Sequence, residues 1–326
     1  MRLGILGAGY IGGVMAKTVR MMNEAKIGDV QLYAVAARNL EKAQAFAREN
    51  KVEKAFGSYE EMLCDPQLDL VYVATPHSHH FEHAKMCIEH KKAALVEKSF
   101  TVNAAQAREL LAMAEENNVL VTEAIWTRYQ PMRRIINDLL ASGIVGAPRT
   151  VTANLSYAIT HNERIVKPEL AGGALLDVGV YTLNFAEMVF GRADEAHATA
   201  VISDLGVDVQ NSMTLFWKDG RMAVLQSGTD AISDRKGIIY CEKGFLIVEN
   251  INNPQSAAVY DSDYQLIKEI SCPPQQTGYE YEVLECAQAL ADGKIECASM
   301  PHEETIHIME LMDKLRAQMG VRYPFE

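Results

Sequence analysis

The chain of 326 residues has little of what marks several common protein classes. Its six cysteines form no C-x-x-C pair and no metal-like spacing, which fits reduced thiols better than a disulfide framework. Acidic residues outnumber basic ones by 43 to 31, and the net charge of −12 argues against nucleic acid or an anionic membrane surface as a partner. No charged leader precedes an apolar stretch, and no apolar run reaches the ~18 residues of a membrane span. We therefore expect a cytoplasmic protein with no membrane partner.

Repeats, low-complexity tracts and an obvious linker are also absent. Hydrophobic residues make up 48% and charged residues 23% of the chain, as in ordinary globular proteins. The chain is long for one hydrophobic core, so we expect two domains, at residues 1–123 and 124–326.

What is present begins with the segment MRLGILGAGYIGG at residues 1–13. Gly7, Gly9 and Gly12 have the G-x-G-x-x-G spacing, after a short apolar strand and before a helix that includes Tyr10 and Ile11. Gly7 permits the sharp turn, Gly9 lets a pyrophosphate approach the backbone, and Gly12 allows close contact between helix and strand. The helix N-terminus offers unpaired N–H groups to phosphates. The segment predicts a dinucleotide site with contacts from all five residues; the alternative is a purely structural glycine turn.

The rest of the first half alternates between strands and helices. A doubly wound parallel sheet, the Rossmann arrangement, follows from this alternation, with its ligand at the carboxyl ends of the strands. The expected strands after the first are 30–37, 54–56, 69–75, 93–97 and 119–122, and the expected helices include 40–50 and 103–117, with capping residues at Ser58 and Asn103.

The second half reads differently, with many strand-like runs between residues 147 and 271 separated by turn signals. This pattern predicts an α+β domain with an open, mainly antiparallel sheet of about six to eight strands. We expect helices near 132–142, 173–190, 279–291 and 303–319, and helices covering one face of the sheet. An apolar face left on the other side would pair with a second copy, which predicts a homodimer.

The choice of cofactor depends on the end of the second strand. An NAD-selective site has an acidic residue there, but this strand is followed by Arg38 and Asn39. The planar cation of Arg38 suits a 2′-phosphate, so we expect NADP, with NAD as the alternative if Arg38 is only a solvated residue at a helix start.

A second candidate group follows the strand 69–75, on the same edge as the glycine loop. Thr75, Pro76 and His80 are expected to contact the nicotinamide side of the cofactor. His79 and His83 are spaced like zinc ligands on a helix, but no H-E-x-x-H arrangement and no third ligand accompanies them, so no metal site is expected.

Two further groups could carry chemistry. Glu97 and Lys98 stand at the end of the strand 93–97 and are expected to contact the cofactor, although a lysine there could equally be a surface cation. Asp177 and Tyr181 lie four residues apart after Gly172 and Gly173 and share a helix face, although an ordinary helix acid and a core tyrosine would look the same.

Together these groups resemble the glucose-fructose oxidoreductase, inositol dehydrogenase and rhizopine-catabolism family (Gfo/Idh/MocA) over essentially the whole chain. The family stretches A-T-P-x-x-x-H, E-K-P and G-G-x-x-x-D-x-G-x-H appear in order at 74–80, 97–99 and 172–181. E-K-S-F-T-V-N at 97–103 and E-A-x-W-T-R at 123–128 are similar to the dimeric dihydrodiol dehydrogenase and aldose dehydrogenase branch. Ser99 stands in place of proline, so a cis bond cannot be assumed there, and Tyr181 replaces the usual histidine; both departures are shared with that branch.

The resemblance implies hydride transfer between a nicotinamide cofactor and a secondary or anomeric hydroxyl of a sugar, polyol or trans-dihydrodiol held between the domains. Tyr181 would move the hydroxyl proton, with Lys98 favouring its phenolate and lowering its pKa from the usual value of about 10. Asp177 would bind a neighbouring hydroxyl. Trp126 would line the substrate pocket, and Arg128 would contact the nicotinamide side or the substrate.

Two other functions stay open from the sequence. A redox glycosidase that retains NAD would release no reduced cofactor during turnover. A nucleotide-sensing regulator without turnover would be expected to lose the catalytic residues, and Lys98, Asp177 and Tyr181 are all present.

Overall fold

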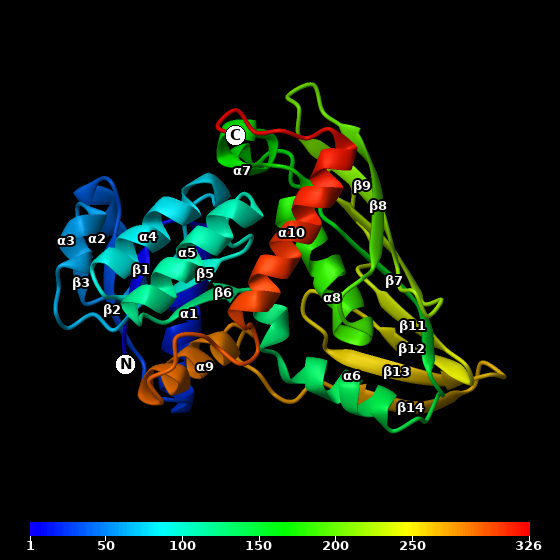
Figure 1. Ribbon diagram of the computed structural model, residues 1–326. Helices are drawn as coiled ribbons and strands as arrows, with labels where there is room; N and C mark the ends of the chain where they lie inside the picture. Colours follow the sequence, from blue (N-terminus) through cyan, green and yellow to red (C-terminus); the bar gives the residue numbers. More distant parts are fainter. The chain divides into compact units, whose positions relative to one another are not determined.

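The computed structural model describes residues 1–326, and its first half forms the parallel sheet that the sequence predicts (Figure 1). Six strands pair in the order β3-β2-β1-β4-β5-β6, all in parallel. Short runs of apolar residues fit this sheet, because helices cover both of its faces. The strands are β1 (Arg2–Leu6), β2 (Gln31–Ala36), β3 (Lys54–Phe56), β4 (Leu70–Val73), β5 (Ala93–Glu97) and β6 (Val121–Ala124).

Side-chain caps set where several covering helices begin. Asn39 accepts a hydrogen bond from the Lys42 N–H, Ser58 from Glu61 and Asn103 from Gln106, and the caps predicted at Ser58 and Asn103 are confirmed. The doubly wound fold predicted for this half is confirmed as well. The helices are α1 (Tyr10–Ala25), α2 (Leu40–Asn50), α3 (Tyr59–Leu63), α4 (His80–Glu89) and α5 (Ala104–Asn117), with short turns η1 (His77–His79) and η2 (Trp126–Arg128).

Two compact units make up the chain, and their boundaries differ from the predicted division at residue 123. Unit 1 comprises Met1–Tyr129 and Gln275–His307, and unit 2 comprises Gln130–Pro274 and Ile308–Glu326. The helix α9 (Glu280–Ala291) therefore packs in unit 1, although the sequence suggested that it closes the second domain. The buried Glu280 carboxylate accepts N–H groups of Gln276 and Gly278 at 2.6 and 2.7 Å, which fixes the loop entering α9.

Unit 2 is built on an eight-stranded sheet in the order β14-β13-β12-β11-β7-β10-β9-β8. All pairs are antiparallel except β7 with β10, so the mainly antiparallel sheet is confirmed with one parallel pair added. The strands are β7 (Pro148–Ser156), β8 (Glu195–Ile202), β9 (Asp208–Phe216), β10 (Met222–Gly228), β11 (Gly237–Cys241), β12 (Gly244–Val248), β13 (Ser256–Asp261) and β14 (Leu266–Ser271).

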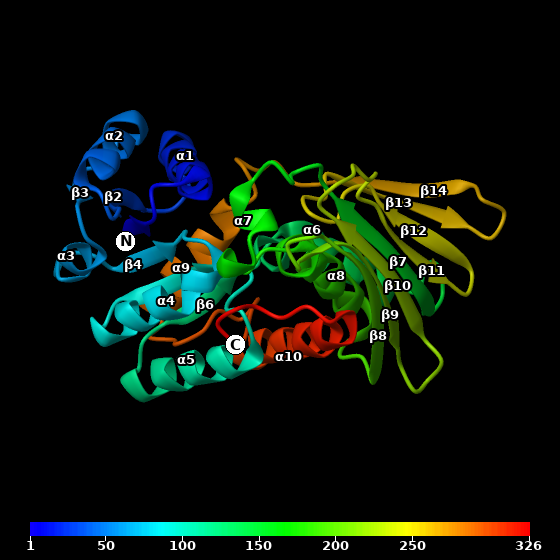
Figure 2. The ribbon, with the colours of Figure 1, turned by 90° about the horizontal axis from the view of Figure 1, so that it is seen from above.

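Helices cover one face of this sheet, as Figure 2 shows for α6 (Pro131–Ala141) and α8 (Val180–Phe190). The remaining helical pieces of unit 2 are α7 (Glu163–Val166), the turns η3 (Pro168–Leu170) and η4 (Leu175–Gly179), and the end of α10 (His302–Met319), whose first residues belong to unit 1. By length and composition alone, the helical segment Pro168–Phe190 could cross a membrane, although the sequence analysis predicted no membrane span. Since 89% of that window is buried inside the structure, the segment fits a core helix.

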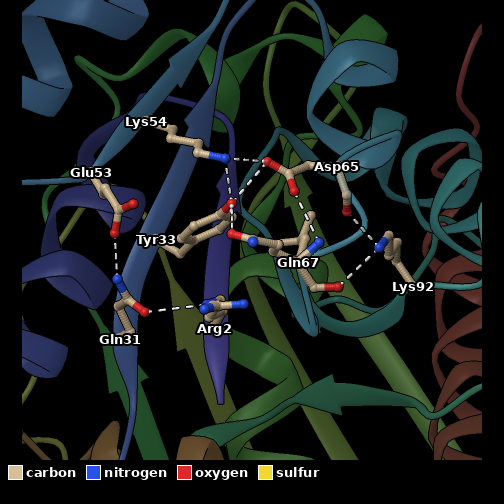
Figure 3. Close-up of polar contacts among 9 residues, drawn as sticks. Arg2, Gln31, Tyr33, Glu53, Lys54, Asp65, Gln67 and Lys92 are labelled. Carbon is tan, nitrogen blue, oxygen red and sulfur yellow. Dashed lines mark hydrogen bonds and ion pairs between the residues drawn. The ribbon is translucent and has the colours of Figure 1, made fainter.

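A polar network lies at the amino ends of the parallel strands (Figure 3). Lys54 Nζ lies 2.8 Å from Asp65 Oδ2, and the Tyr33 hydroxyl donates to the same oxygen at 2.9 Å. Lys92 Nζ donates to the carbonyls of Asp65 and Leu68 at 2.7 and 3.0 Å. The hydrogen bond from Lys54 is the main reason that the pKa of Asp65 falls to about 2. Because ligands of such sheets bind at the carboxyl ends of the strands, this network is structural and the site lies at the opposite edge.

Candidate functional site

The glycine loop after β1 combines tight packing with open space. Gly7 has φ of +116°, and a Cβ on it would lie 2.8 Å from the carbonyl oxygen of Ala74. A Cβ on Gly12 would lie 2.6 Å from the Gly7 carbonyl oxygen. Around Gly9, in contrast, a Cβ would meet nothing within 4 Å. Gly7 and Gly12 thus let α1 and the loop approach the sheet, while Gly9 borders room for a ligand.

The first turn of α1 has the properties of a phosphate site. Gly9 is its N-cap residue and supplies no side-chain cap, and the turn carries no acidic residue. Its first residue, Tyr10, is 89% exposed. Backbone N–H groups in such a turn have no partner within the helix and favour an anion. Tyr10 and Ile11 are the first two residues of this turn, which fits the pyrophosphate of a dinucleotide.

Arg38 follows β2 at the same edge of the sheet, and its side chain is exposed. It makes no hydrogen bond and no ion pair within the chain, and the next residue, Asn39, is occupied as the cap of α2. No carboxylate occupies the place where an NAD-selective site has one. The end of β2 thus presents an unpaired cation.

His80 joins the loops that follow β4 and β5. Its ring is fully buried, with Nδ1 2.7 Å from the Ser99 carbonyl oxygen and Nε2 2.8 Å from that of Thr75. Burial lowers the pKa of His80 to about 4. Both ring nitrogens face backbone, so His80 fixes the positions of these loops, and any contact of Thr75, Pro76 or His80 with a cofactor stays a prediction.

Glu97 ends β5 at the carboxyl edge, and Lys98 follows it directly. Glu97 is buried and accepts a hydrogen bond from the hydroxyl of Tyr72, whereas Lys98 is half-buried. The Lys98–Ser99 peptide is cis although residue 99 is a serine. Glu123 accepts the Phe100 N–H at 3.1 Å, and burial raises the pKa of Glu123 to about 7.

The turn η2 carries the two candidates after β6. The ring of Trp126 stacks on Tyr279 with centroids 4.1 Å apart and planes 12° apart. Arg128 is buried and pairs with Glu304 at 2.9 Å, so its guanidinium holds η2 against the first turn of α10. This ion pair explains why Arg128 is buried. A contact of Arg128 with the cofactor or substrate stays a prediction.

Asp177 and Tyr181 lie in unit 2, on the turn η4 and at the start of α8. The η4 segment is a π-helix, a form that is frequent at functional sites. Both side chains are largely buried, and Asp177 Oδ1 pairs with Arg164 Nη1 of α7 at 2.6 Å. The Arg164 side chain is 41% exposed, so a cation borders the predicted substrate-binding acid.

A buried network under η4 holds this segment in place. Asp208 Oδ2 accepts the Leu175 N–H and the Asn211 side-chain amide, both at 2.8 Å. Ser227 donates to Asn211 Oδ1 at 2.7 Å. Burial raises the pKa of Asp208 to about 6. Because Gly173 packs against Asp208, the network fixes the backbone just before Asp177.

The site residues fall into two groups, one in each unit. The carboxyl edge of the parallel sheet brings together the glycine loop, Arg38, the loop after β4 and Lys98, while Asp177 and Tyr181 share η4 and α8. His79 and His83 are joined by no third ligand that could hold a metal. The sequence reading missed four residues that position these side chains: Arg164, Asp208, Asn211 and Tyr279.

Family models match both halves of the chain. Residues 1–125 match the oxidoreductase family with an NAD-binding Rossmann fold, GFO_IDH_MocA, and residues 134–247 match the GFO/IDH/MocA C-terminal domain. Among curated proteins, the chain is 35% identical over 303 residues to trans-1,2-dihydrobenzene-1,2-diol dehydrogenase of Xenopus tropicalis, covering 91% of this chain and 92% of the relative.

A second curated relative is the D-xylose 1-dehydrogenase (NADP(+)) of Hypocrea jecorina, 34% identical over 312 residues, with 83% of this chain and 78% of the relative covered. The fold is similar to that of KijD10, a 3-ketoreductase from Actinomadura kijaniata solved with NADP. The TM-score is 0.88 at 23% identity over 98% of both chains.

Proposed function

Because this chain belongs to the Gfo/Idh/MocA family of oxidoreductases, we propose that it is an NADP-dependent dehydrogenase or reductase. Its substrate would be a secondary or anomeric hydroxyl of a sugar or a trans-dihydrodiol, as the names of the two curated relatives suggest. The observation that carries the proposal is Lys98 at the carboxyl end of β5, on the edge that also carries the open glycine loop. A nicotinamide cofactor, when bound, supplies the hydride acceptor or donor.

The residues of the chain would handle the proton and the substrate. We propose that Tyr181 exchanges the proton of the reacting hydroxyl, and that the ammonium of Lys98 stabilises the phenolate form of this tyrosine. Asp177 would accept a hydrogen bond from a neighbouring substrate hydroxyl, with Arg164 at 2.6 Å keeping its carboxylate oriented. Trp126, held flat on Tyr279, would provide an apolar wall for the substrate.

The test is a panel of aldoses, polyols and trans-dihydrodiols, each with NADP and with NAD, followed by absorbance of the reduced cofactor. We expect turnover with at least one member of these classes and a higher kcat/KM with NADP. Substrate cleavage without net formation of reduced cofactor would instead indicate a redox glycosidase. Binding of the cofactor without turnover of any member would favour a regulator.

The preference for NADP is expected to depend on Arg38. A charge-assisted hydrogen bond contributes ~1.5–3 kcal/mol, which corresponds to roughly 10- to 150-fold in affinity. Arg38→Ala should therefore remove most of the preference for NADP and leave NAD affinity nearly unchanged. Dissociation constants for both cofactors, measured by quenching of protein fluorescence, check this. Equal NADP affinity in the wild type and the variant would contradict the assignment.

We also propose a homodimer formed through the uncovered face of the sheet in unit 2. Strand register places Phe216, Tyr240 and Leu266 in one row across this face, exposed by 37%, 40% and 53%, and Val224 lies on the same face at 40%. Side chains on the other face, such as Leu215 and Leu225, are fully buried under the helices. Exposed apolar side chains gathered on one face of a sheet are typical of an interface.

Sedimentation at micromolar concentration should give about twice the monomer mass of 36.1 kDa. Val224→Arg places a charge in the apolar face and should shift the protein toward monomer, because burying an unpaired charge is costly. Ile232→Arg, at a position outside the strands that is 83% exposed, is the matched control and should leave the dimer intact. A monomeric wild type, or a dimer unaffected by Val224→Arg, would contradict this interface.

A further inference from the structure

A cationic and aromatic cluster lies at the carboxyl edge of the parallel sheet, where β2 and β4 end. It consists of Arg38 after β2, Tyr59 at the start of α3, and His79 and His83 of η1 and α4. His83 Nδ1 lies 2.9 Å from the Thr75 hydroxyl. The His83 ring meets Tyr59 edge-on with centroids 4.7 Å apart, and the ring of His79 is 5.7 Å away.

The charge of Arg38 acts on all three rings of this cluster. The other charged or titratable groups that act on His83 are His79 and His80, and none of these is an acid. Glu60 acts on Tyr59, and the remaining acids of α3 and α4 that lie nearest in sequence, Glu61 and Glu82, are exposed. In a chain with a net charge of −12, this is a local cationic site without a carboxylate partner.

The surroundings favour the neutral form of both histidines when the site holds no anion. Burial is the main cause that lowers the pKa of His83 to about 4, and burial together with Arg38 lowers the pKa of His79. An anion placed against Arg38 would reverse the electrostatic part of this shift, because a negative charge favours the protonated imidazole.

We propose that His79 and His83 complete the 2′-phosphate site of NADP around Arg38, and that the imidazole facing the phosphate gains a proton when the phosphate binds. The inference rests on the proposed function, since it assumes that Arg38 meets the 2′-phosphate. It adds two specificity-determining residues and a pH dependence of cofactor choice that Arg38 alone does not give, because a guanidinium stays charged at all relevant pH values.

The sign of the pH dependence separates the two possibilities. A phosphate monoester has a second pKa of about 6, so the dianion is lost as pH falls from 8 to 6. A site with Arg38 alone would then prefer NADP less at pH 6 than at pH 8. With a histidine that takes up a proton, the preference rises instead, because the imidazolium adds a charge-assisted hydrogen bond to the phosphate.

The experiment measures dissociation constants of NADP and NAD by titration calorimetry at pH 8, 7 and 6, with NAD as the matched ligand without the phosphate. In the wild type, the ratio of NAD to NADP dissociation constants should rise by roughly tenfold from pH 8 to pH 6, the lower end for a charge-assisted hydrogen bond. In the double variant His79→Gln and His83→Gln, the ratio should stay level or fall.

Three further outcomes are distinguishable. A falling ratio in the wild type, or an equal rise in the double variant, overturns the histidine proposal while leaving the preference for NADP in place. An Arg38→Ala variant that keeps full preference for NADP at pH 8 overturns the assignment of Arg38 to the 2′-phosphate, whereas a wild type that prefers NAD at every pH overturns the NADP dependence in the proposed function. Single variants at His79 and His83 then assign the pH dependence to one ring. Loss of NAD binding in either variant would indicate misfolding. Circular dichroism tests for this, and replacing the same histidine by Asn provides a second variant for the measurement.

Discussion

Replacing Tyr181 by phenylalanine is expected to lower kcat by about 10²–10⁴ with cofactor affinity nearly unchanged. The change keeps the ring, which is only 7% exposed and packed in α8, and removes the hydroxyl that would move the substrate proton. Lys98→Met should cost a similar factor. Because residues that act as one unit are not additive, the double variant should lose much less than the product of the two single effects.

The competing assignment gives the proton to Lys98 itself and leaves Tyr181 to hold the substrate. It predicts that Tyr181→Phe raises KM and keeps most of kcat. Steady-state kinetics on the best substrate of the panel decide between the two assignments. Tyr264→Phe, at a position that is 77% exposed in the turn between β13 and β14, is the control for a lost hydroxyl elsewhere and should have wild-type kinetics.

Much of the fold could be predicted from the sequence because its signals are local. Apolar runs such as LVYV at Leu70–Val73, a glycine loop between strand and helix, and caps at Ser58 and Asn103 each specify a few neighbouring residues. The alternation of these elements then limits the sheet to a few arrangements. The doubly wound parallel sheet could therefore be predicted from local signals plus one general rule of topology, whereas the order of its six strands was not predicted.

The parts that failed depend on contacts between distant residues. No local signal shows that α9 returns to unit 1, since it does so through contacts such as the 2.8 Å hydrogen bond between Thr18 and Thr277. The parallel pairing of β7 with β10 is likewise hidden, because strands read the same in either direction. Strand content could be predicted for unit 2, but strand neighbours could not.

In the candidate site, too, the residues marked by local sequence motifs could be predicted, and those that act through distant contacts could not. Its motif residues could be found because glycine spacing and the stretches around Lys98 and Asp177 are local in sequence. Asp208 and Asn211 support that segment from β9, some thirty residues later, and no spacing links them to it. Nothing local in the sequence distinguishes Arg164 from other charged loop residues, because its partner Asp177 lies thirteen residues later.

The other large expected effect concerns Gly173, which joins the substrate-binding segment to this support. Its φ is +116°, a region that costs residues other than glycine roughly 1–3 kcal/mol. A Cβ there would also lie 2.2 Å from Asp208 Oδ1, and the Asp208 carboxylate is held by Leu175 and Asn211 and cannot move without breaking those hydrogen bonds. Overpacking of this kind adds roughly 1–3 kcal/mol.

Gly173→Ala should therefore lower the free energy of unfolding of unit 2 by about 2–6 kcal/mol and reduce kcat, because the π-turn with Asp177 begins two residues later. Gly206→Ala is the matched control, since Gly206 has φ of +88° and a Cβ there would meet nothing within 4 Å. The control isolates the cost of the backbone conformation.

Adding Asp208→Ser to Gly173→Ala removes the obstructing carboxylate, so the double variant should lose less stability than the sum of the two single changes. Urea unfolding of the wild type, the three single variants and the double variant measures this coupling. Equal losses in Gly173→Ala and Gly206→Ala, with additive behaviour of the double variant, would show that the packing of Gly173 on Asp208 does not hold the segment.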